Sequence, residues 1–265
     1  MPFEGLAIRT HVYIDGFNLY YGALKNGPYK WLDVVKLSQE LIGSSDTVER
    51  VKYFTARVSG AADPDAPRRQ QAYLNALKTL PQVEVIFGSF MAKTIWRPLA
   101  NLPVAGATIR SPSPLSLPAG NHTVTGGSLN QNATLPSGVY SQGGHKSKKR
   151  TIRPLNDALI AEVHTMEEKG SDVNLAAHLL NDAWKGNFEA ALVITNDTDL
   201  CVPIDMVAKQ LKLPVYVACP KLGGSLAAGL ENVATFPRHV KAHMLRDSQF
   251  PDPILPRRLA KPLGW

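Results

Sequence analysis

The feature that most constrains this fold is a pair of apolar runs, far apart in the sequence, that each end in acidic residues. The first spans residues 11–18 (HVYIDGFN) and the second residues 191–199 (ALVITNDTD). A β-branched apolar run that gives way to carboxylates is typical of a buried parallel strand with acids at its C-terminal end. In open α/β sheets, ligands bind beside those ends. Both motifs therefore predict a site at one edge of a parallel sheet.

The acids of these motifs favour a hard divalent cation. Asp15 ends the first run, and Asp197 and Asp199 follow the second. Mg²⁺ and Mn²⁺ prefer oxygen ligands in octahedral surroundings, so three carboxylates aimed at one crevice predict a metal site. Structural interpretations stay open for each motif alone: Asp15 can open a turn, and Asn18 and the Asp197–Asp199 group can cap helices.

The rest of the chain alternates between strand and helix patterns. Strands are predicted at residues 12–15, 49–54, 83–87, 190–195 and 214–218, and helices at 18–25, 33–43, 66–79, 171–184, 200–211 and 225–234. Asp33 is the predicted N-cap of the second helix, and Pro67 lies in the first turn of the third. Residues 158–166 fit either a helix or a strand. Alternation of this kind predicts a doubly wound α/β fold with a mostly parallel sheet.

The helix over residues 171–184 supplies a further acid. Ser171 is its expected N-cap, which leaves Asp172 in the first turn, where the helix dipole favours a carboxylate. Asp172 is also a candidate ligand for a metal or a water molecule. The expected buried face consists of Val173, Ala176, Ala177, Leu180 and Ala183. His178 on the same helix is expected to be packed or half-exposed rather than a ligand.

The chain is predicted to form one domain over residues 1–245, interrupted by an insertion at about 98–150. The insertion is rich in Pro, Gly, Ser, Asn and Thr and has no sustained period, and residues 246–265 form a Pro-rich tail expected to be extended. Neither a secretory signal nor a transmembrane helix is visible, and the two cysteines look like core residues. We therefore expect a cytoplasmic protein without membrane contact.

Charge is concentrated around the insertion. No Asp or Glu lies between Glu84 and Asp157, and this window carries 8 basic residues of a chain whose net charge is +7. A basic segment joined to an acid-lined site suits a polyanionic substrate. A solvated basic loop that only aids solubility remains an equal alternative.

Three motifs together resemble the NYN domain family, the bacterial LabA-like proteins related to PIN-domain nucleases. They are residues 13–18 (YIDGFN), 169–173 (KGSDV) and 195–200 (TNDTDL). The resemblance covers most of residues 10–220, and the long basic insertion departs from it. It implies a three-layer α/β/α PIN-like fold. It also implies a metal-dependent ribonuclease in which Asp15, Asp172, Asp197 and Asp199 bind Mg²⁺ or Mn²⁺, with Asn18 beside them. The bound metal then activates water for phosphodiester hydrolysis.

The sequence therefore predicts an endoribonuclease with RNA as its partner. The alternatives are a non-catalytic RNA-binding or regulatory module and, less favoured, a DNA nuclease or a nucleotide phosphohydrolase. Homo-oligomerisation stays open. A basic cluster at the end of the insertion is expected to bind the RNA backbone without reading sequence; it consists of Lys146, Lys148, Lys149, Arg150 and Arg153.

Overall fold

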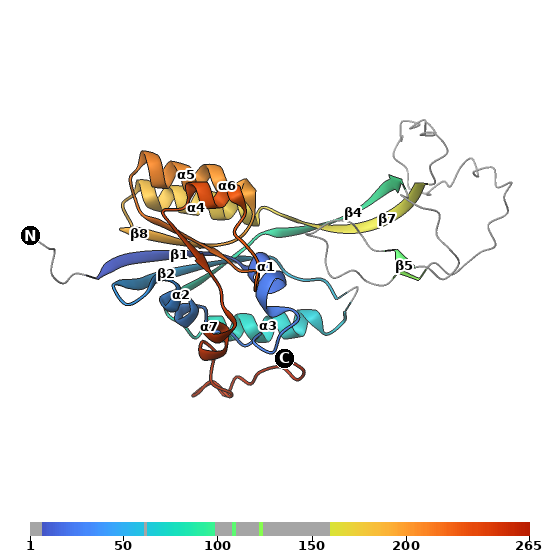
Figure 1. Cartoon of the computed structure of the whole chain (residues 1–265). Coiled ribbons are helices and arrows are strands. Elements are labelled where there is room, and N and C mark those ends of the chain that lie inside the picture. Colours follow the sequence, from blue (N-terminus) through green and yellow to red (C-terminus); the bar gives the residue numbers. More distant parts are fainter. Residues whose placement is uncertain (1–6, 61–62, 99–107, 110–121, 124–159) are drawn as a thin grey trace, which may run out of the picture. The chain divides into compact units, whose positions relative to one another are not determined.

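The structure is a computed structural model, and it describes residues 7–60, 63–98, 108–109, 122–123 and 160–265 (Figure 1). Its contacts divide the chain into two units. The first comprises residues 1–90 and 168–265, and the second comprises residues 91–167. The first unit carries the six-stranded sheet and all the helices that the structure describes, so it contains every candidate acid of the sequence analysis.

The first unit is built on a six-stranded sheet. In chain order the strands are β1 (Ile8–Asp15), β2 (Asp46–Thr55), β3 (Val83–Phe87), β8 (Ala190–Ile194), β9 (Val215–Cys219) and β10 (Phe236–His239). Their spatial order is β10-β9-β8-β1-β2-β3, and all neighbouring strands are parallel. The strand order reverses between β1 and β8, which is the switch point of a doubly wound fold. The predicted α/β class is confirmed.

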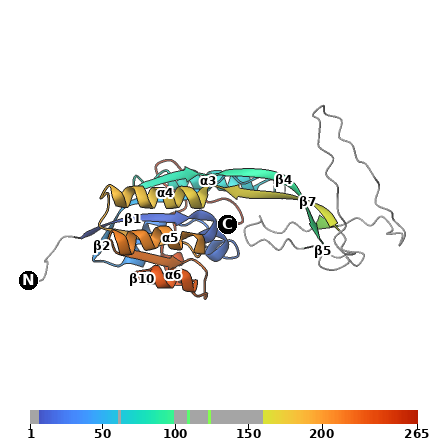
Figure 2. The ribbon, with the colours of Figure 1, turned by 90° about the horizontal axis from the view of Figure 1, so that it is seen from above.

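Helices cover both faces of the sheet. The helices α4 (Ser171–Trp184), α5 (Cys201–Asp205) and α6 (Ala228–Val233) lie on one face, with α4 and α5 in contact along it (Figures 1 and 2). On the other face lie α2 (Val34–Ile42), α3 (Ala66–Leu77) and α7 (Ala242–Asp247) (Figure 1). Successive side chains of β1 point to opposite faces of the sheet, so Val12 and Ile14 pack into one core cluster and Tyr13 packs into the other. The result is a three-layer α/β/α domain.

Local sequence features explain where several helices begin. The Asp33 side chain accepts hydrogen bonds from the backbone N–H groups of Val35 and Lys36, as an N-cap does. Pro67 lies in the first turn of α3. The helix predicted at 18–25 is instead the short α1 (Gly16–Leu19) followed by a π-helical turn over Tyr20–Leu24. Gly16 is required there, because an added Cβ would lie 2.6 Å from the backbone oxygen of Phe54.

The predicted buried face of α4 is only partly right. Ala183 is buried, and Ala176 and Leu180 pack partly against the core. Val173, however, is 71% exposed, whereas Leu175 and Leu179, which were not predicted, are fully buried. Two apolar stripes on this helix fit the helical period, and the sheet covers the one that also carries the buried Asp182. Ser171 is not the N-cap either. That position belongs to Gly170, whose φ of 91° lies in the left-handed region that favours glycine.

The ambiguous segment before α4 is a strand. β7 (Ile160–Lys169) pairs with β4 (Ser89–Pro98) in a two-stranded sheet, and β4 was not predicted. Within the expected insertion, β5 (Thr108–Ile109) pairs antiparallel with β6 (His122–Thr123). Most of the remaining insertion lies outside the described residues.

The C-terminal segment packs against the domain instead of extending away from it. Phe250 and Ile254 are buried in the core cluster beneath the sheet, and the Trp31 indole N–H donates to the backbone oxygen of Pro251 (3.2 Å). β10 and α7 precede this segment and were not predicted. In the part of the chain that the structure describes, no helix is long and apolar enough to cross a membrane.

Candidate functional site

The two acidic motifs leave the sheet side by side. β1 and β8 are adjacent and parallel, with Ile14 paired to Ile194. Asp15 and Thr195 therefore follow at the same, carboxyl edge of the sheet. This edge lies at the switch point, where open α/β sheets bind their ligands.

Asp15 is buried and firmly oriented. It is 4% exposed, and its Oδ1 accepts from the Asn18 backbone N–H (2.9 Å). Its Oδ2 accepts from the Asn18 side-chain amide (2.6 Å) and from the Thr195 hydroxyl (3.3 Å). Burial raises the pKa of Asp15, and these hydrogen bonds oppose that rise. A carboxylate offers about four lone-pair positions, so about one, on Oδ1, is left for a ligand.

The segment after β8 forms a compact acidic turn beside Asp15. The buried Thr195 hydroxyl accepts from the Asp197 backbone N–H (3.1 Å) while donating to Asp15. Asp197 caps the short 3₁₀ helix Thr198–Leu200 by accepting from the Asp199 backbone N–H (3.0 Å). Asp199 is exposed. Thr195 therefore connects the two motifs, a role that its position in the sequence does not indicate.

Asp172 belongs to the same group of carboxylates. It lies in the first turn of α4, and its pKa is raised to about 6 by burial and by the negative charges of Asp15, Asp197 and Asp199. Charges that act on one another in this way lie within about a Debye length, so the four carboxyl groups share one region of the sheet edge. The structure thus brings together all four predicted acids, with Asn18 hydrogen-bonded among them. We call Asp15, Asp172, Asp197 and Asp199 the acidic edge.

The donor atoms of the acidic edge suit a divalent cation, but the side chains are not arranged to coordinate one. Its donors are carboxylate oxygens, and a bound cation would relieve the repulsion that raises the pKa of Asp172. Among the described residues, however, no three His, Cys, Asp or Glu side chains are already placed to hold a metal ion. Binding would require side-chain movement, for which the exposed Asp199 has room.

A pocket of about 440 Å³ lies in the loops that follow β9 and β10. Lys221, His239 and Lys241 line it, and none of the described lining residues is acidic. The first of these loops is tied to the neighbourhood of the acidic edge, because the Asn196 side chain accepts from the Ala227 backbone N–H (2.8 Å). Sequence reasoning missed this pocket, since it depends on how loops distant from the motifs fold.

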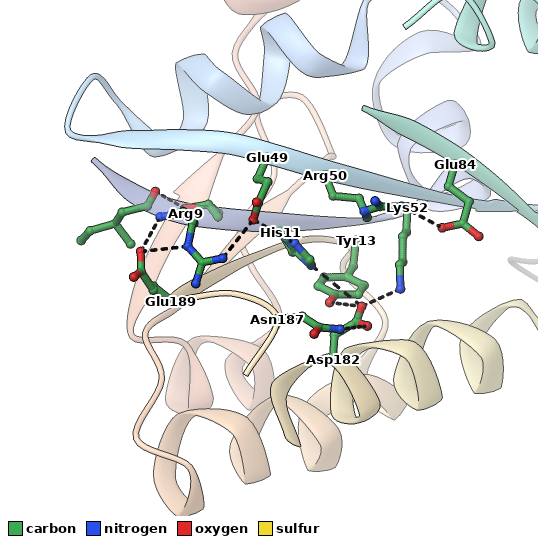
Figure 3. A network of polar contacts seen from close by, with 12 residues as sticks. Arg9, His11, Tyr13, Glu49, Arg50, Lys52, Glu84, Asp182, Asn187 and Glu189 are labelled. Atoms are coloured by element: carbon green, nitrogen blue, oxygen red, sulfur yellow. Dashed lines mark hydrogen bonds and ion pairs between the residues drawn. The ribbon is translucent and has the colours of Figure 1, made fainter. Parts of the chain in front are cut away.

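A buried polar network lies on the α4 face of the sheet, toward the other end of that helix (Figure 3). Asp182 accepts from Lys52 Nζ (2.6 Å), from the Tyr13 hydroxyl (2.7 Å) and from the Asn187 side-chain amide (3.1 Å). Burial raises the pKa of Asp182, but these donors outweigh it and leave the pKa below its ordinary value. His178 is half-buried, as expected, and lies 3.1 Å from Lys52 Nζ.

Two predictions about other residues have different outcomes. The RNA-binding cluster Lys146, Lys148, Lys149, Arg150 and Arg153 lies outside the described residues, so it stays a prediction. Both cysteines are free, with Cys219 buried at the end of β9 and Cys201 partly buried.

Comparisons with known proteins give one informative relative. No family model matches the chain. The chain is 27% identical, over 97% of its own length and 75% of the relative's, to the 6-hydroxy-3-succinoylpyridine 3-monooxygenase HspA of Pseudomonas putida. It also resembles the crystal structure of a protein of unknown function from Vibrio parahaemolyticus, with 11% identity, a TM-score of 0.46 and coverage of 89% of this chain and 94% of that one.

This relative overturns the predicted activity. It is a monooxygenase and thus an oxidoreductase, so the prediction of a metal-dependent ribonuclease of the hydrolase class is wrong. The same finding counts against the alternatives of an RNA-binding module, a DNA nuclease and a nucleotide phosphohydrolase. The error has a physical cause, because a carboxylate cluster at a sheet edge specifies the kind of cation it suits and not the reaction carried out there.

Proposed function

We propose that this protein is a monooxygenase that acts on a hydroxylated N-heteroaromatic acid. The observation that carries the proposal is the likeness to a monooxygenase along 97% of the chain. In such a reaction one atom of dioxygen enters the substrate, the other leaves as water, and an external reductant such as a reduced nicotinamide supplies two electrons. The compound in the relative's name is a hydroxypyridine with a succinoyl chain, which ends in a carboxylic acid.

We place the reaction centre at the acidic edge. Support comes from its position at the switch point and from the pKa of Asp172, which burial and the neighbouring carboxylates raise to about 6. Asp15, Asp172, Asp197 and Asp199 would hold Mn²⁺ or Mg²⁺ through carboxylate oxygens. Of the two, Mn²⁺ can change its oxidation state and so would supply electron transfer to dioxygen.

A flavin does not fit this edge. In dinucleotide-binding folds the first β–α turn is rich in glycine, and the pyrophosphate sits at the N-terminus of the helix that follows. Here that turn begins with the buried Asp15 carboxylate, which itself accepts the Asn18 backbone N–H at the start of α1. The Asp15 charge would repel a pyrophosphate.

The residues around the acidic edge suit the two ends of the proposed substrate. Lys221 and Lys241 supply positive charge, and together with His239 they supply hydrogen-bonding groups, for its carboxylate. Just after Asp15, the rings of Phe17 and Tyr21 stack with centroids 6.3 Å apart, and Tyr21 is partly exposed. An aromatic ring in this neighbourhood gains favourable offset or edge contacts.

Asp172 has the properties of a proton carrier. With a pKa of about 6 before a cation binds, its carboxyl group exchanges protons near neutral pH. Hydroxylation of an aromatic ring releases the proton of the carbon that is attacked. We assign the Asp172 Oδ that is not bound to the cation to accept that proton, because three hydrogen bonds leave Asp15 only about one acceptor position.

Two broader expectations also remain proposals. The free Cys201 and Cys219 and the need for a reductant fit the reducing cytoplasm. The meeting of the YIDGFN, KGSDV and TNDTDL motifs at one edge supports common ancestry with NYN-domain proteins. That ancestry concerns the scaffold and not the reaction.

The proposal is tested by supplying 6-hydroxy-3-succinoylpyridine, reduced nicotinamide and Mn²⁺ or Mg²⁺ to the purified protein. We expect oxygen consumption and nicotinamide oxidation that depend on the heteroaromatic acid and on the cation. The exposed Arg68→Gln variant on α3 should match the parent, and Asp15→Asn should be inactive. Oxygen consumption that is equal in the parent and Asp15→Asn would remove the acidic edge from the reaction. Absence of consumption with every cation and hydroxypyridine acid would overturn the proposed function.

A further inference from the structure

The outer side of the layer formed by α4 and α5 exposes large apolar side chains (Figure 1). Val173 and Trp184 of α4 are 71% and 70% exposed, and Val202 of the neighbouring α5 is 68% exposed. Outside the C-terminal segment, these are the three most exposed large apolar side chains among the described residues. Single apolar residues at a surface need no explanation, but several on one layer mark an interaction surface.

The outward side of α4 lacks the charges that a solvated helix normally carries. The two charged residues of α4 lie elsewhere, because Asp172 belongs to the acidic edge and Asp182 is buried against the sheet. The helices of the opposite layer differ, and α2, for example, exposes Lys36 and Glu40. The exposed residues of α4 are Val173, Ala177, Asn181 and Trp184. This composition is typical of the centre of a protein interface, where charges are depleted and Trp is enriched.

The spacing of the apolar residues makes this side of α4 complementary to itself. Val173, Ala177, Leu180 and Trp184 follow one another at intervals of four, three and four residues, an order that is the same in both directions. Such intervals place all four side chains along one stripe of the helix. We call this stripe, together with Val202, the apolar face.

We propose that the apolar face is the interface of a homodimer in which the α4 helices of two copies pack antiparallel. A two-fold axis between Ala177 and Leu180 sets Val173 against the partner's Trp184 and Ala177 against the partner's Leu180. Each contact joins a larger side chain to a smaller one, so the two stripes can interdigitate. Ala177 near the axis also lets the two helices approach closely.

The absence of charge on the exposed residues of α4 favours a second copy over other occupants. Two copies of a chain with a net charge of +7 repel each other, and an uncharged face is where this repulsion costs least. A nucleic acid would instead require basic side chains on this face. The exposed ion pair between Asp205 and Lys209 of the α5 side suits the polar rim that surrounds an apolar interface.

The size of the apolar face sets the expected affinity. α4 has 14 residues and is therefore about 21 Å long, and packed helices lie about 8–10 Å apart, so α4 and α5 together present a face about 20 Å square. Specific interfaces begin at about 600 Å² of accessible surface per partner, and a helical face of this size is near that lower limit. We therefore expect a dissociation constant in the micromolar range.

The antiparallel arrangement keeps the two acidic edges apart. Asp172 directly precedes Val173, so it lies at one end of the stripe. In the dimer the two copies of Asp172 are then about 20 Å apart along the helix axes. Each copy retains its own acidic edge, and the proposed dimer does not depend on the reaction proposed above.

The first test is sedimentation equilibrium of the full chain at about 1 to about 200 µM, concentrations that bracket the expected dissociation constant. The parent should be in equilibrium between monomer and dimer, and Trp184→Lys should associate at least about ten-fold more weakly. Lysine suits the C-terminal end of a helix, so this variant should fold like the parent, as circular dichroism can show. The matched control is Leu255→Lys, which changes a side chain of equal exposure in the C-terminal segment and should dimerise as the parent does. A parent that stays monomeric, or equal association of parent and Trp184→Lys, would overturn the proposal, whatever else covers the apolar face.

The second test examines the antiparallel register. Val173→Glu places a carboxylate in the first helical turn, where the dipole favours it, and should also weaken the dimer. In the antiparallel pair, the combined Val173→Glu/Trp184→Lys variant sets each new Glu against the partner's new Lys. It should therefore associate at least about ten-fold more tightly than either single variant. A combined variant that associates as weakly as the single ones would refute this register.

Discussion

Removing the Asp182 carboxylate should cost a large part of the protein's stability. Asp182→Ala deletes the acceptor of three donors, at 2.6 Å from Lys52, 2.7 Å from Tyr13 and 3.1 Å from Asn187. It leaves the Lys52 ammonium, whose residue is 7% exposed, without its counter-charge. Breaking one side of a buried ion pair costs about 3–5 kcal/mol. Because native domains are stable by roughly 5–15 kcal/mol, the loss should be conspicuous.

Urea denaturation followed by circular dichroism measures this loss, and the slope of the transition shows whether the unfolded state has changed. The matched control is Tyr13→Phe/Lys52→Met/Asp182→Leu, which removes the whole network and should lie within about 2 kcal/mol of the parent because no buried charge is left alone. Asp182 has a lowered pKa in the folded protein, so its contribution is present above the ordinary Asp pKa and is lost as pH falls through the lower, folded value. The difference between parent and Asp182→Ala should therefore shrink in acid. A loss of less than about 1 kcal/mol at neutral pH would refute the reasoning.

Three further predictions follow from the site and the core. The pKa of Asp172 is about 6 in the folded protein, above its ordinary value, so the parent's unfolding temperature should fall as pH rises through the window up to about 6. Asp172→Asn should flatten that fall. Identical pH profiles of parent and variant would contradict the crowding of the acidic edge. Lys221→Gln/Lys241→Gln should raise KM for a heteroaromatic acid without lowering kcat, and the KM for its methyl ester should not change. In urea denaturation, Leu179→Ala should lower the free energy of unfolding by about 2–5 kcal/mol, and the exposed Val173→Ala should lower it by less than about 0.5 kcal/mol. The buried face expected from the sequence predicts the reverse order.

Local patterns in the sequence are enough to predict the scaffold and its acidic edge. Runs such as residues 190–195 are long enough, and their ends polar enough, to identify buried parallel strands. Parallel strands share one carboxyl edge, so the strand pattern places Asp15 and Asp197 at that edge, and the adjacency of β1 and β8 in the structure brings them together. The role of Asp172 needs the resemblance to a known family as well, because an acid in the first helical turn has an ordinary explanation.

The missed features depend on contacts between distant residues. The buried Asp182 of α4 forms an ion pair with Lys52 of β2, and no local sequence pattern indicates that a charged residue is buried. Both apolar stripes of α4 fit its period, and only the sheet decides which one is covered. β10, α7 and the packing of Phe250 similarly depend on surfaces created by the rest of the fold. The sequence pattern does not identify the reaction either, because carboxylates at a sheet edge are compatible with many chemistries.

The most direct test of the proposed monooxygenase activity at the acidic edge is to follow the oxygen atoms of isotopically heavy dioxygen into the product. The protein is supplied with 6-hydroxy-3-succinoylpyridine, reduced nicotinamide, Mn²⁺ and heavy dioxygen in ordinary water, and the product is examined by mass spectrometry. We predict that the product of the parent protein gains one heavy oxygen atom and that Asp15→Asn gives none, although it remains folded. A product that takes its new oxygen from water, or heavy oxygen incorporated equally by Asp15→Asn, would contradict a monooxygenase centred on the acidic edge.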